Sequence, residues 1–195
     1  MTLPPASDTR PTLDEAGTAP AGTQPTLTTA DGKVDDAAVA FSVFSKLLAS
    51  GDLRAALYAL LRRTDYRFIG IFRFKDGRAT SVVHVDRENL SALQADEVAD
   101  TATYCSFVRN TGKPFAVADS IADTRLQGHV ARAVVRSYCG APLVGADGSF
   151  IGTLCHYDVV PRPPTQVDMG LLQKVCEAIG NSSLVPPYPN LPQRP

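Results

Sequence analysis

The 195-residue sequence predicts an α+β protein with a central antiparallel sheet of about five to six strands and helices on both faces. Three observations lead to this prediction. Asp76-Gly77 and Asp147-Gly148 each lie between apolar, β-rich runs, which indicates two hairpins because Gly tolerates the positive φ of a tight turn. Runs with helical spacing precede the first hairpin and follow the second. The strands are apolar on both faces, so each face needs a covering layer.

Two helices are expected before the first strand. From residue 34 to 49, apolar residues recur at spacings of three and four, which is typical of one buried helix face. Gly51 and Asp52 then supply a helix-ending glycine and a new N-cap. A second helix carrying Leu53, Leu57, Leu60 and Leu61 should follow.

The remaining elements follow from alternation, turn residues and helix caps. We expect strands at 67–74 and 79–85, a polar helix-compatible segment at 88–98, a short helix at 103–110, a strand at 115–118, a loop with one short helix at 119–133 and a hairpin at 136–158. A closing helix should start at the capping-box-like sequence Thr165 to Asp168 and end at Gly180. In the central hairpin, Gly140 and Gly152 mark close approaches to the backbone.

Composition divides the chain into a domain and two tails. Residues 1–33 are rich in Thr, Pro, Ala and Gly and lack periodicity, so we expect a disordered N-terminal tail. Residues 34–182 form the predicted domain. Proline recurs through residues 183–195, which predicts an extended C-terminal tail.

Charge and hydropathy argue against two classes of partner. Nineteen basic and twenty acidic residues give a net charge of -1, so no overall basic field attracts nucleic acid or an anionic membrane. No apolar run approaches the roughly 20 residues of a membrane span, and the N-terminus lacks the order of a secretory signal. We therefore expect a cytoplasmic protein that binds neither nucleic acid nor membrane.

The four cysteines are Cys105, Cys139, Cys155 and Cys176. They form no C-x-x-C pair and no metal-ligand spacing, so no metal site is expected. In a reducing cytoplasm they are expected to be buried small hydrophobes. His156 could ligate haem iron, but on a strand it and Cys155 point to opposite faces and cannot serve one pocket.

An ordered set of short motifs runs through the second half of the chain. The set comprises Tyr104 to Val108, Gly112-Lys113-Pro114, Val117-Ala118-Asp119, Asp123-Thr124-Arg125, Val135 to Leu143, Asp147 to Cys155, Asp158 and Pro161-Arg162. Over about residues 35–182 this set resembles the GAF domain family, and especially bacterial sensor GAF domains that read roughly Y-G-A-P-L … G-x-x-I-G-T-L-C … D … P-R.

The resemblance implies a PAS-like fold and a role in signal transduction. It implies a non-catalytic sensor that binds an unidentified small molecule, acts as a homodimer and works with a signalling partner protein. The cofactor is unknown, because the signatures of cyclic-nucleotide and chromophore-binding members are missing. A ligand-free interaction module using the apolar stripe of helix 34–49 is one alternative. A cysteine-based redox switch or reductase using Cys105, Cys139 or Cys155 is another.

The candidate ligand-binding residues come from the predicted roof of the sheet and from the central hairpin. They are Tyr104, Phe107, Asp119, Asp123, Arg125, His129 and Tyr138. Structural roles are open for most of them. Asp119 and Asp123 can hold the loop through side-chain-to-backbone bonds, and Tyr104 and Phe107 can be core. Arg125 and His129 can belong to a solvated basic face.

Overall fold

The computed structural model describes residues 36–186 and 188, so the predicted N-terminal tail and most of the C-terminal tail lie outside the described residues. The described residues form an α+β fold around one six-stranded sheet of order β3-β2-β1-β6-β5-β4. Every neighbouring pair of strands is antiparallel. The predicted fold class is therefore confirmed.

The elements and their bounds are as follows. The α-helices are α1 (Asp36–Ala49), α2 (Leu53–Leu61), α3 (Cys105–Thr111) and α4 (Met169–Gly180). The strands are β1 (Phe68–Lys75), β2 (Arg78–Asp86), β3 (Val98–Ala99), β4 (Phe115–Val117), β5 (Ser137–Val144) and β6 (Phe150–Asp158). Four short 3-10 helices are η1 (Asp100–Ala102), η2 (Thr124–Leu126), η3 (Val130–Ala133) and η4 (Pro164–Gln166).

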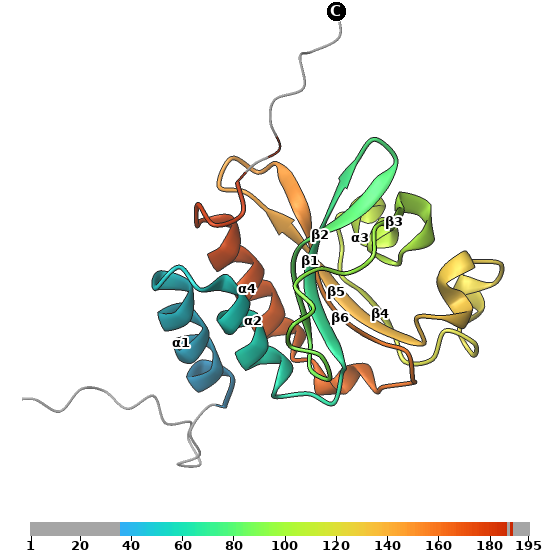
Figure 1. Cartoon of the computed structure of the whole chain (residues 1–195), viewed down its shortest axis with the longest axis horizontal. Helices are drawn as coiled ribbons and strands as arrows, with labels where there is room; N and C mark the ends of the chain where they lie inside the picture. The colour runs from blue at the N-terminus through green and yellow to red at the C-terminus, as the bar shows by residue number, and fades with distance from the viewer. Residues whose placement is uncertain (1–35, 187, 189–195) are drawn as a thin grey trace, which may run out of the picture.

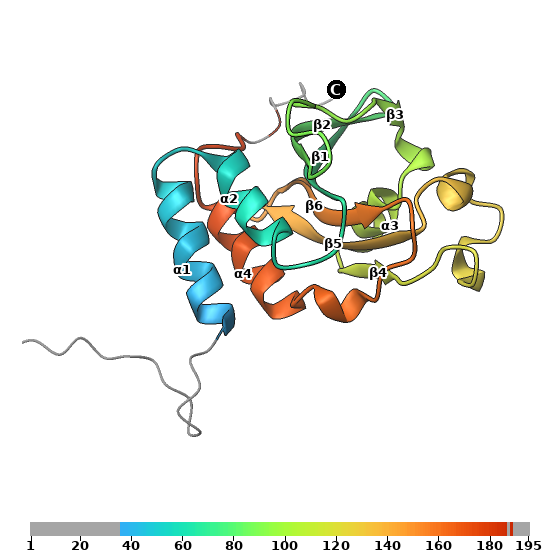
Figure 2. The same cartoon turned by 60° about the horizontal axis from the view of Figure 1, so that its bottom comes forward.

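Two unequal layers cover the sheet. Helices α1, α2 and α4 lie on one side, which we call the helical face, and α3 lies on the opposite side (Figure 1). The second view shows the same separation, with the segment that carries η2 and η3 at the far end from α1 (Figure 2). We call the side of α3 the roof face.

The helix ends form where the sequence places its capping residues. Asp52 caps α2 by accepting a hydrogen bond from the Ala55 amide at 2.8 Å. Gly112, in the left-handed region with φ of 62°, ends α3. At α4 the N-cap is Asp168, whose carboxylate accepts from the Leu171 amide at 2.9 Å. The predicted start at Thr165 is wrong, because Thr165 lies in η4 and the helix begins four residues later.

The first hairpin forms at the predicted Asp-Gly turn. Asp76 and Gly77 both have positive φ, 51° and 74°, and Lys75 pairs with Arg78 across them. This is the backbone that a two-residue turn of the primed type requires. The second hairpin joins β5 and β6 through residues 145–149, where Asp147 accepts from the Ser149 amide at 2.9 Å.

The segment between β2 and α3 differs from the prediction. Residues 88–98, predicted to be helix-compatible, form irregular chain that ends in the short strand β3. Its amides bond to side chains instead: the Ala95 amide donates to the Ser81 hydroxyl at 3.0 Å. This bond ties the segment to β2 and takes up an amide that a helix would use.

Asp158, part of the family-like motif, joins three segments at one end of the sheet. It is 1% exposed, and its carboxylate accepts from the Arg67 amide at 3.0 Å, from the Arg162 guanidinium at 2.8 Å and from the Val160 amide at 3.2 Å. A buried carboxylate needs such partners. The motif residues Asp158 and Arg162 therefore hold the fold together.

The two faces of the sheet carry separate hydrophobic cores. The larger core lies on the helical face and includes Phe44, Leu57, Ile71, Leu154 and Val175. The smaller one lies on the roof face and joins sheet residues such as Phe72, Tyr138 and Cys155 to Tyr104 and Leu126 of the roof. The alternation along the strands therefore supplies both cores, as a two-sided sheet requires.

Candidate functional site

The main cavity of the described residues lies on the roof face, between the sheet and the chain that follows β2. Its volume is about 390 Å³, within the range of small-molecule sites. The sheet supplies Arg67, Phe68, Phe72, His84, Asp86, Tyr138, Cys155, Tyr157 and Val159; the roof supplies Ala92, Gln94, Ala95, Asp96, Val98, Ala102, Thr103, Tyr104, Cys105, Val134 and Val135. We call this space the roof cavity.

Aromatic rings form the walls of the roof cavity. Phe68 stacks on Tyr157 with 4.7 Å between ring centroids, and His84 stacks on Phe68 at 5.6 Å. Tyr104 and Tyr138 meet edge to face at 5.8 Å. These ring contacts orient the side chains of the walls relative to one another.

An ion-pair network lies at one side of the cavity. The Arg67 guanidinium donates to both oxygens of Asp86, at 2.9 and 2.8 Å, and pairs with Glu88 at 2.7 Å. The hydrogen bond from Arg67 holds the pKa of the Asp86 carboxyl below its usual range. Burial lowers the pKa of His84, whose Nε2 is 2.9 Å from the Tyr157 hydroxyl. His84 is therefore neutral at physiological pH.

Two thiols lie together where α3 meets the sheet. The Sγ atoms of Cys105 and Cys155 are 3.7 Å apart, and the Tyr138 hydroxyl donates to Cys105 Sγ at 3.3 Å. Burial raises the pKa of Cys105, but hydrogen bonds from Cys155, Tyr138 and Thr103 outweigh it and leave the pKa below its ordinary value. Burial holds the pKa of Cys155 well above the ordinary value.

Gly140 makes room for the Tyr138 ring. A Cβ at position 140 would overlap the Tyr138 hydroxyl and ring, and would come within 2.9 Å of Cys155 Cβ. The close approach predicted at Gly140 is therefore made by neighbouring side chains of the cavity wall. Gly152 shows the other expected close approach, where a Cβ would lie 2.8 Å from the Phe72 carbonyl oxygen.

The structure brings two of the seven candidate ligand-binding residues to the roof cavity, Tyr104 and Tyr138. Both are buried, at 1% and 2% exposure, and the Tyr104 hydroxyl donates to the Val135 carbonyl at 3.1 Å. Phe107 and His129 lie behind this wall, with His129 4.9 Å from Tyr104 and 5.6 Å from Phe107 between ring centroids. They contact a lining residue without lining the cavity themselves.

Asp119, Asp123 and Arg125 lie outside the cavity lining and hold the roof segment together. Asp119 accepts from the Ile121 amide at 3.0 Å and pairs with Arg136 at 2.8 Å. Asp123 accepts from the Arg125 amide at 3.0 Å and pairs with the Arg125 guanidinium at 2.5 Å. Bonds of this kind were the expected alternative to ligand binding for Asp119 and Asp123, because they hold a loop in place.

Several lining residues were not among the sequence candidates, above all Arg67, His84, Asp86, Asp96 and Tyr157. Asp96 lies in the roof segment before β3, and the others lie on or next to β1, β2 and β6, which are adjacent in the sheet. The signal in the sequence was alternation: Phe68, Phe72 and Tyr157 fall on the face shared with Cys155. The sequence alone does not give the strand order, which places β1 between β2 and β6 and so brings His84 and Tyr157 together.

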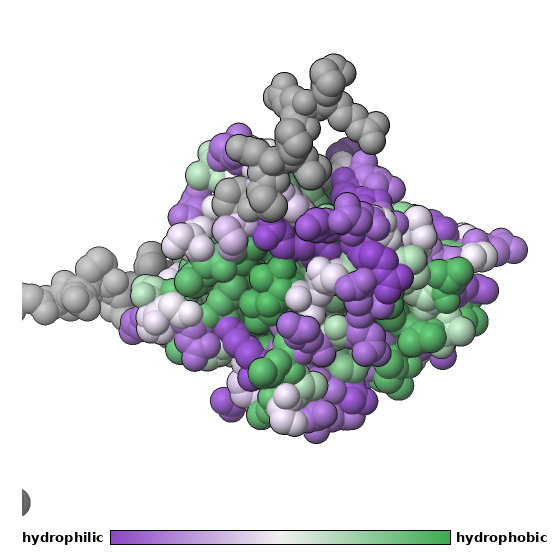
Figure 3. All heavy atoms as spheres, turned by 45° about the horizontal axis from the view of Figure 1, so that its top comes forward, coloured by the Kyte–Doolittle hydropathy of each residue, from purple (hydrophilic) through white to green (hydrophobic). Residues whose placement is uncertain are grey.

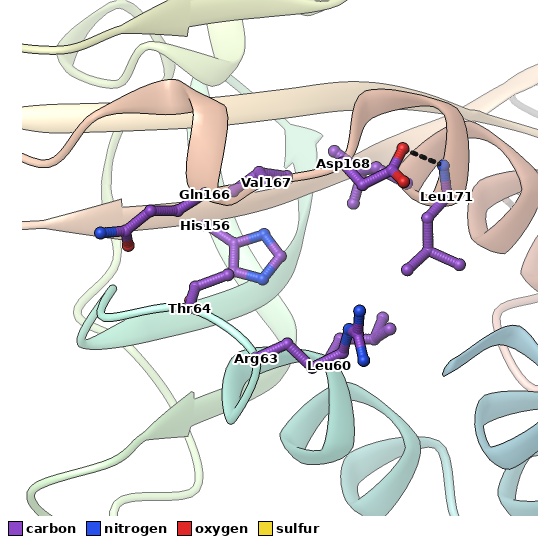
Figure 4. Close-up of a pocket in the computed structure, with 9 residues that line it drawn as sticks. Leu60, Arg63, Thr64, His156, Gln166, Val167, Asp168 and Leu171 are labelled. Atoms are coloured by element: carbon purple, nitrogen blue, oxygen red, sulfur yellow. Dashed lines mark hydrogen bonds between the residues drawn. The ribbon is translucent and has the colours of Figure 1, made fainter. Parts of the chain in front are cut away.

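A smaller cavity of about 60 Å³ lies on the helical face, between the end of α2 and the start of α4. Figure 4 shows the His156 ring at its base, between Thr64 and Val167, with the Gln166 amide directed away. His156 is 3% exposed, and neither ring nitrogen has a hydrogen-bond partner among the described residues. Burial, with the charge of Arg87, lowers its pKa to about 3. The cavity has room for only a few water-sized groups.

Cys155 and His156 point to opposite faces, as expected for neighbours on a strand. Cys155 lines the roof cavity and His156 lines the small cavity on the helical face. Cys139 also faces the helices, where its Sγ is 3.1 Å from Met169 Sδ, and burial raises its pKa to about 12. In the part of the chain that the structure describes, no cluster of three His, Cys, Asp or Glu side chains could hold a metal ion.

The surface carries apolar areas in two places. Figure 3 shows one toward the helices at the left of the view and another toward the right, with hydrophilic surface between them. On α1, Val39 and Val43 are 46% and 45% exposed; on the roof, Val130 and Val134 are 72% and 64% exposed. Among the described residues, no helix has the length and apolar character needed to cross a bilayer.

The described residues form an α+β fold in which short elements roof a cavity over an antiparallel sheet. No family model and no curated protein matches the sequence. Solved structures do match. The GAF domain of an Acinetobacter phosphoenolpyruvate-protein phosphotransferase is 10% identical, with 74% of this chain and 90% of that chain covered and a TM-score of 0.59. A putative GAF sensor protein from Burkholderia vietnamiensis is 21% identical, with 77% and 89% covered and a TM-score of 0.50.

The chain has the GAF fold, which confirms the resemblance seen in its motifs. The fold is shared with sensor and regulatory domains, and one solved chain of this fold carries bound biliverdin IXa. A common fold does not transfer a ligand from one chain to another.

The prediction that the chain is not an enzyme is wrong as an inference from the fold. A free methionine-R-sulfoxide reductase from Neisseria meningitidis, in complex with its substrate, is 16% identical, with 81% of this chain and 94% of that chain covered and a TM-score of 0.57. The fold therefore supports catalysis as well as sensing, and function has to be argued from the roof cavity itself.

Proposed function

We propose that this chain is a sensory or regulatory GAF domain that binds a small organic molecule in the roof cavity. The observation that carries the proposal is the space of about 390 Å³ between aromatic walls and an ion-pair network. Apolar walls with a few fixed polar groups are typical of ligand sites. The roof of the cavity is irregular chain, which can reorder when a ligand binds and so report occupancy.

A cavity-filling variant tests this proposal. Ala92 lines the roof cavity, so Ala92→Trp should fill part of it. We would screen a small-molecule library by thermal shift on the wild-type protein and on the variant. A ligand at 100 times its Kd stabilises by about 2.7 kcal/mol, which gives a clear rise in Tm. Compounds that stabilise the wild type should fail to stabilise Ala92→Trp.

Ala122→Trp is the matched control, because Ala122 is exposed and outside the cavity lining. It should respond to the same compounds as the wild type. Hits that stabilise Ala92→Trp equally well would contradict binding in the roof cavity. A library without hits, together with an unchanged oligomeric state in both variants, would favour the alternative of a ligand-free interaction module.

The proposed signalling role includes a homodimer and a partner protein. Helix α1 supports this part, because Val39 and Val43 are about half exposed on one apolar stripe. Light scattering should give a dimeric mass at micromolar concentration, and Val43→Asp should shift it to a monomer. A monomeric mass for the wild-type protein would contradict the proposed dimer. It would have no bearing on the proposed ligand binding, which the library screen tests separately.

A second candidate function is thiol-based reduction of a small sulfoxide, since Cys105 and Cys155 lie 3.7 Å apart beside the cavity. Two thiols and one sulfoxide would give a disulfide, a sulfide and water: the Cys105 sulfur attacks, the oxygen leaves as water with the two thiol protons, and the Cys155 sulfur closes the disulfide. Free methionine-R-sulfoxide, the substrate class of the Neisseria relative, is the first oxidant to test.

Intact mass and product analysis test the redox candidate. Incubating the fully reduced protein with free methionine-R-sulfoxide should form one disulfide and an equal amount of methionine. Cys155→Ser should stop the disulfide, whereas Cys176→Ser, on the helical face, should behave as the wild type. A wild-type protein that keeps all four thiols after prolonged incubation would eliminate this function.

A further inference from the structure

The charge around the roof cavity is unequal. Its lining holds one guanidinium, Arg67, and two carboxylates, Asp86 and Asp96. Glu88 adds a third carboxylate through its ion pair with Arg67. Arg54 lies nearby, donating to the carbonyls of His84 and Leu90 at 3.2 and 2.7 Å. Three carboxylates and two guanidinium groups give this side of the roof cavity a negative net charge.

The single cation of the lining already has two carboxylate partners. All three guanidinium nitrogens of Arg67 are engaged, two by Asp86 and one by Glu88. Its carbon also lies 4.7 Å from the centroid of the Phe68 ring. A ligand carboxylate or phosphate would have to break this network to bind Arg67, which makes the cavity a poor anion site.

One carboxylate of the lining has no protein partner. Within residues 36–186 and 188, the exposed Asp96 makes no ion pair or hydrogen bond, and its charge acts on both His84 and Tyr157. His84 is 3% exposed, and its Nδ1 is buried without a partner while Nε2 lies against the Tyr157 hydroxyl. Because Nδ1 has almost no accessible surface, a ligand in the cavity reaches the Asp96 carboxylate and not this nitrogen.

We infer that the roof cavity selects organic cations: primary or secondary amines, or amidines, on an apolar body of about the size of a phenylalkyl group. The ammonium donates to the Asp96 carboxylate, and the body lies between the rings of Phe72, Tyr104 and Tyr138. Aromatic faces attract a cation as well as an apolar body. This inference rests on the proposed ligand-binding function and specifies the class of ligand.

Three probes of nearly equal shape test the inference: 2-phenylethylamine, 2-phenylethanol and 3-phenylpropanoate. Binding to the full chain would be measured by calorimetry at low ionic strength, where charge effects are least screened. The amine should bind about tenfold tighter than the alcohol, and the carboxylate should bind weakest.

Asp96→Asn should lower the affinity for the amine about threefold to fivefold and leave that for the alcohol unchanged, as for removal of an exposed charge. Asp76→Asn is the matched control. Asp76 lies in the β1–β2 turn, away from the lining, and its positive φ of 51° suits Asn. This variant should bind all three probes as the wild type does.

Tighter binding of the carboxylate, or an amine preference that survives in Asp96→Asn, would overturn the cation inference. In both cases the binding that remains would still support the ligand-binding function if Ala92→Trp abolishes it. Absence of saturable amine binding up to about 10 mM would overturn the cation inference too. The library screen with Ala92→Trp then decides separately whether the cavity binds anything else.

Discussion

The two faces of the sheet differ in how completely they are filled. On the helical face, three helices cover strands β1, β5 and β6 with a continuous core, and the one cavity noted there measures about 60 Å³. On the roof face, one short helix and irregular chain leave about 390 Å³. The helical face is the more completely packed of the two, whereas the roof face keeps a cavity. This division is typical of a scaffold that carries a binding cavity.

The largest expected effect is the loss of unfolding free energy when a buried leucine of either core is replaced by alanine. Leu57 and Leu126 are both fully buried, the first against the helical face and the second under the roof. Leu57→Ala should cost about 2–5 kcal/mol of unfolding free energy, and Leu126→Ala should fall at the low end of that range because loose surroundings collapse more easily. Chemical denaturation of both variants measures the difference. A larger loss for Leu126→Ala would contradict the comparison.

The next effect concerns pH and the helical face. His156 has a folded pKa of about 3, so between that value and the unfolded value of about 6.5 the unfolded chain binds a proton that the folded chain does not. The contribution of this difference to the free energy of unfolding is therefore complete above about pH 6.5. It is lost as the pH falls, at up to about 1.4 kcal/mol per pH unit.

His156→Phe should remove this slope, and the small cavity beside the ring leaves room for the larger side chain. Denaturation curves of wild type and variant between pH 7 and about pH 4 isolate the contribution, since His84 and His129 titrate alike in both. Parallel pH profiles would show that His156 does not carry it.

A smaller effect probes the roof face. Tyr138→Phe removes the hydroxyl that donates to Cys105 Sγ at 3.3 Å. Loss of this bond should cost about 1 kcal/mol and raise the pKa of the Cys105 thiol. Iodoacetamide should then label Cys105 more slowly at neutral pH, while Cys176, buried on the helical face, serves as the internal reference. Unchanged labelling would show that Tyr138 does not tune this thiol.

The smallest expected effect lies outside both cores. Arg125→Ala removes an exposed ion pair with Asp123 and should cost less than about 1 kcal/mol. Because Arg125 lies outside the roof cavity, the affinity for any cavity ligand should stay as in the wild type. Calorimetry with a hit from the library screen measures this. A strong loss of affinity would return Arg125 to the candidate ligand-binding residues.

The sequence predicts much of the fold because its signals are local. The turn at Asp76-Gly77 depends only on the backbone preference of these two residues. The caps Asp52 and Gly112 depend only on the helices that they begin or end. The segment 88–98 was mispredicted because its polar composition suits a helix, whereas its amides bond to side chains such as Ser81 instead.

The site was harder to predict because it depends on strand order. His84 and Tyr157 are far apart in the chain, and only the placement of β1 between β2 and β6 brings them within 2.9 Å. Motif residues drew attention to Asp119 and Asp123, whose carboxylates are used in holding the roof segment. Membership of a motif therefore does not separate residues that hold the scaffold from residues that line the cavity, since Tyr104 and Tyr138 also belong to the motif set and do line it.

Gly140 has a consequence for how such a protein can diversify. Any side chain at this position would displace the Tyr138 ring and push against Cys155, both of which border the roof cavity. A single substitution at position 140 could thus reshape the roof cavity without altering a residue that lines it. The helical face would remain as it is, so new specificities could be explored on a scaffold whose folding is secured elsewhere.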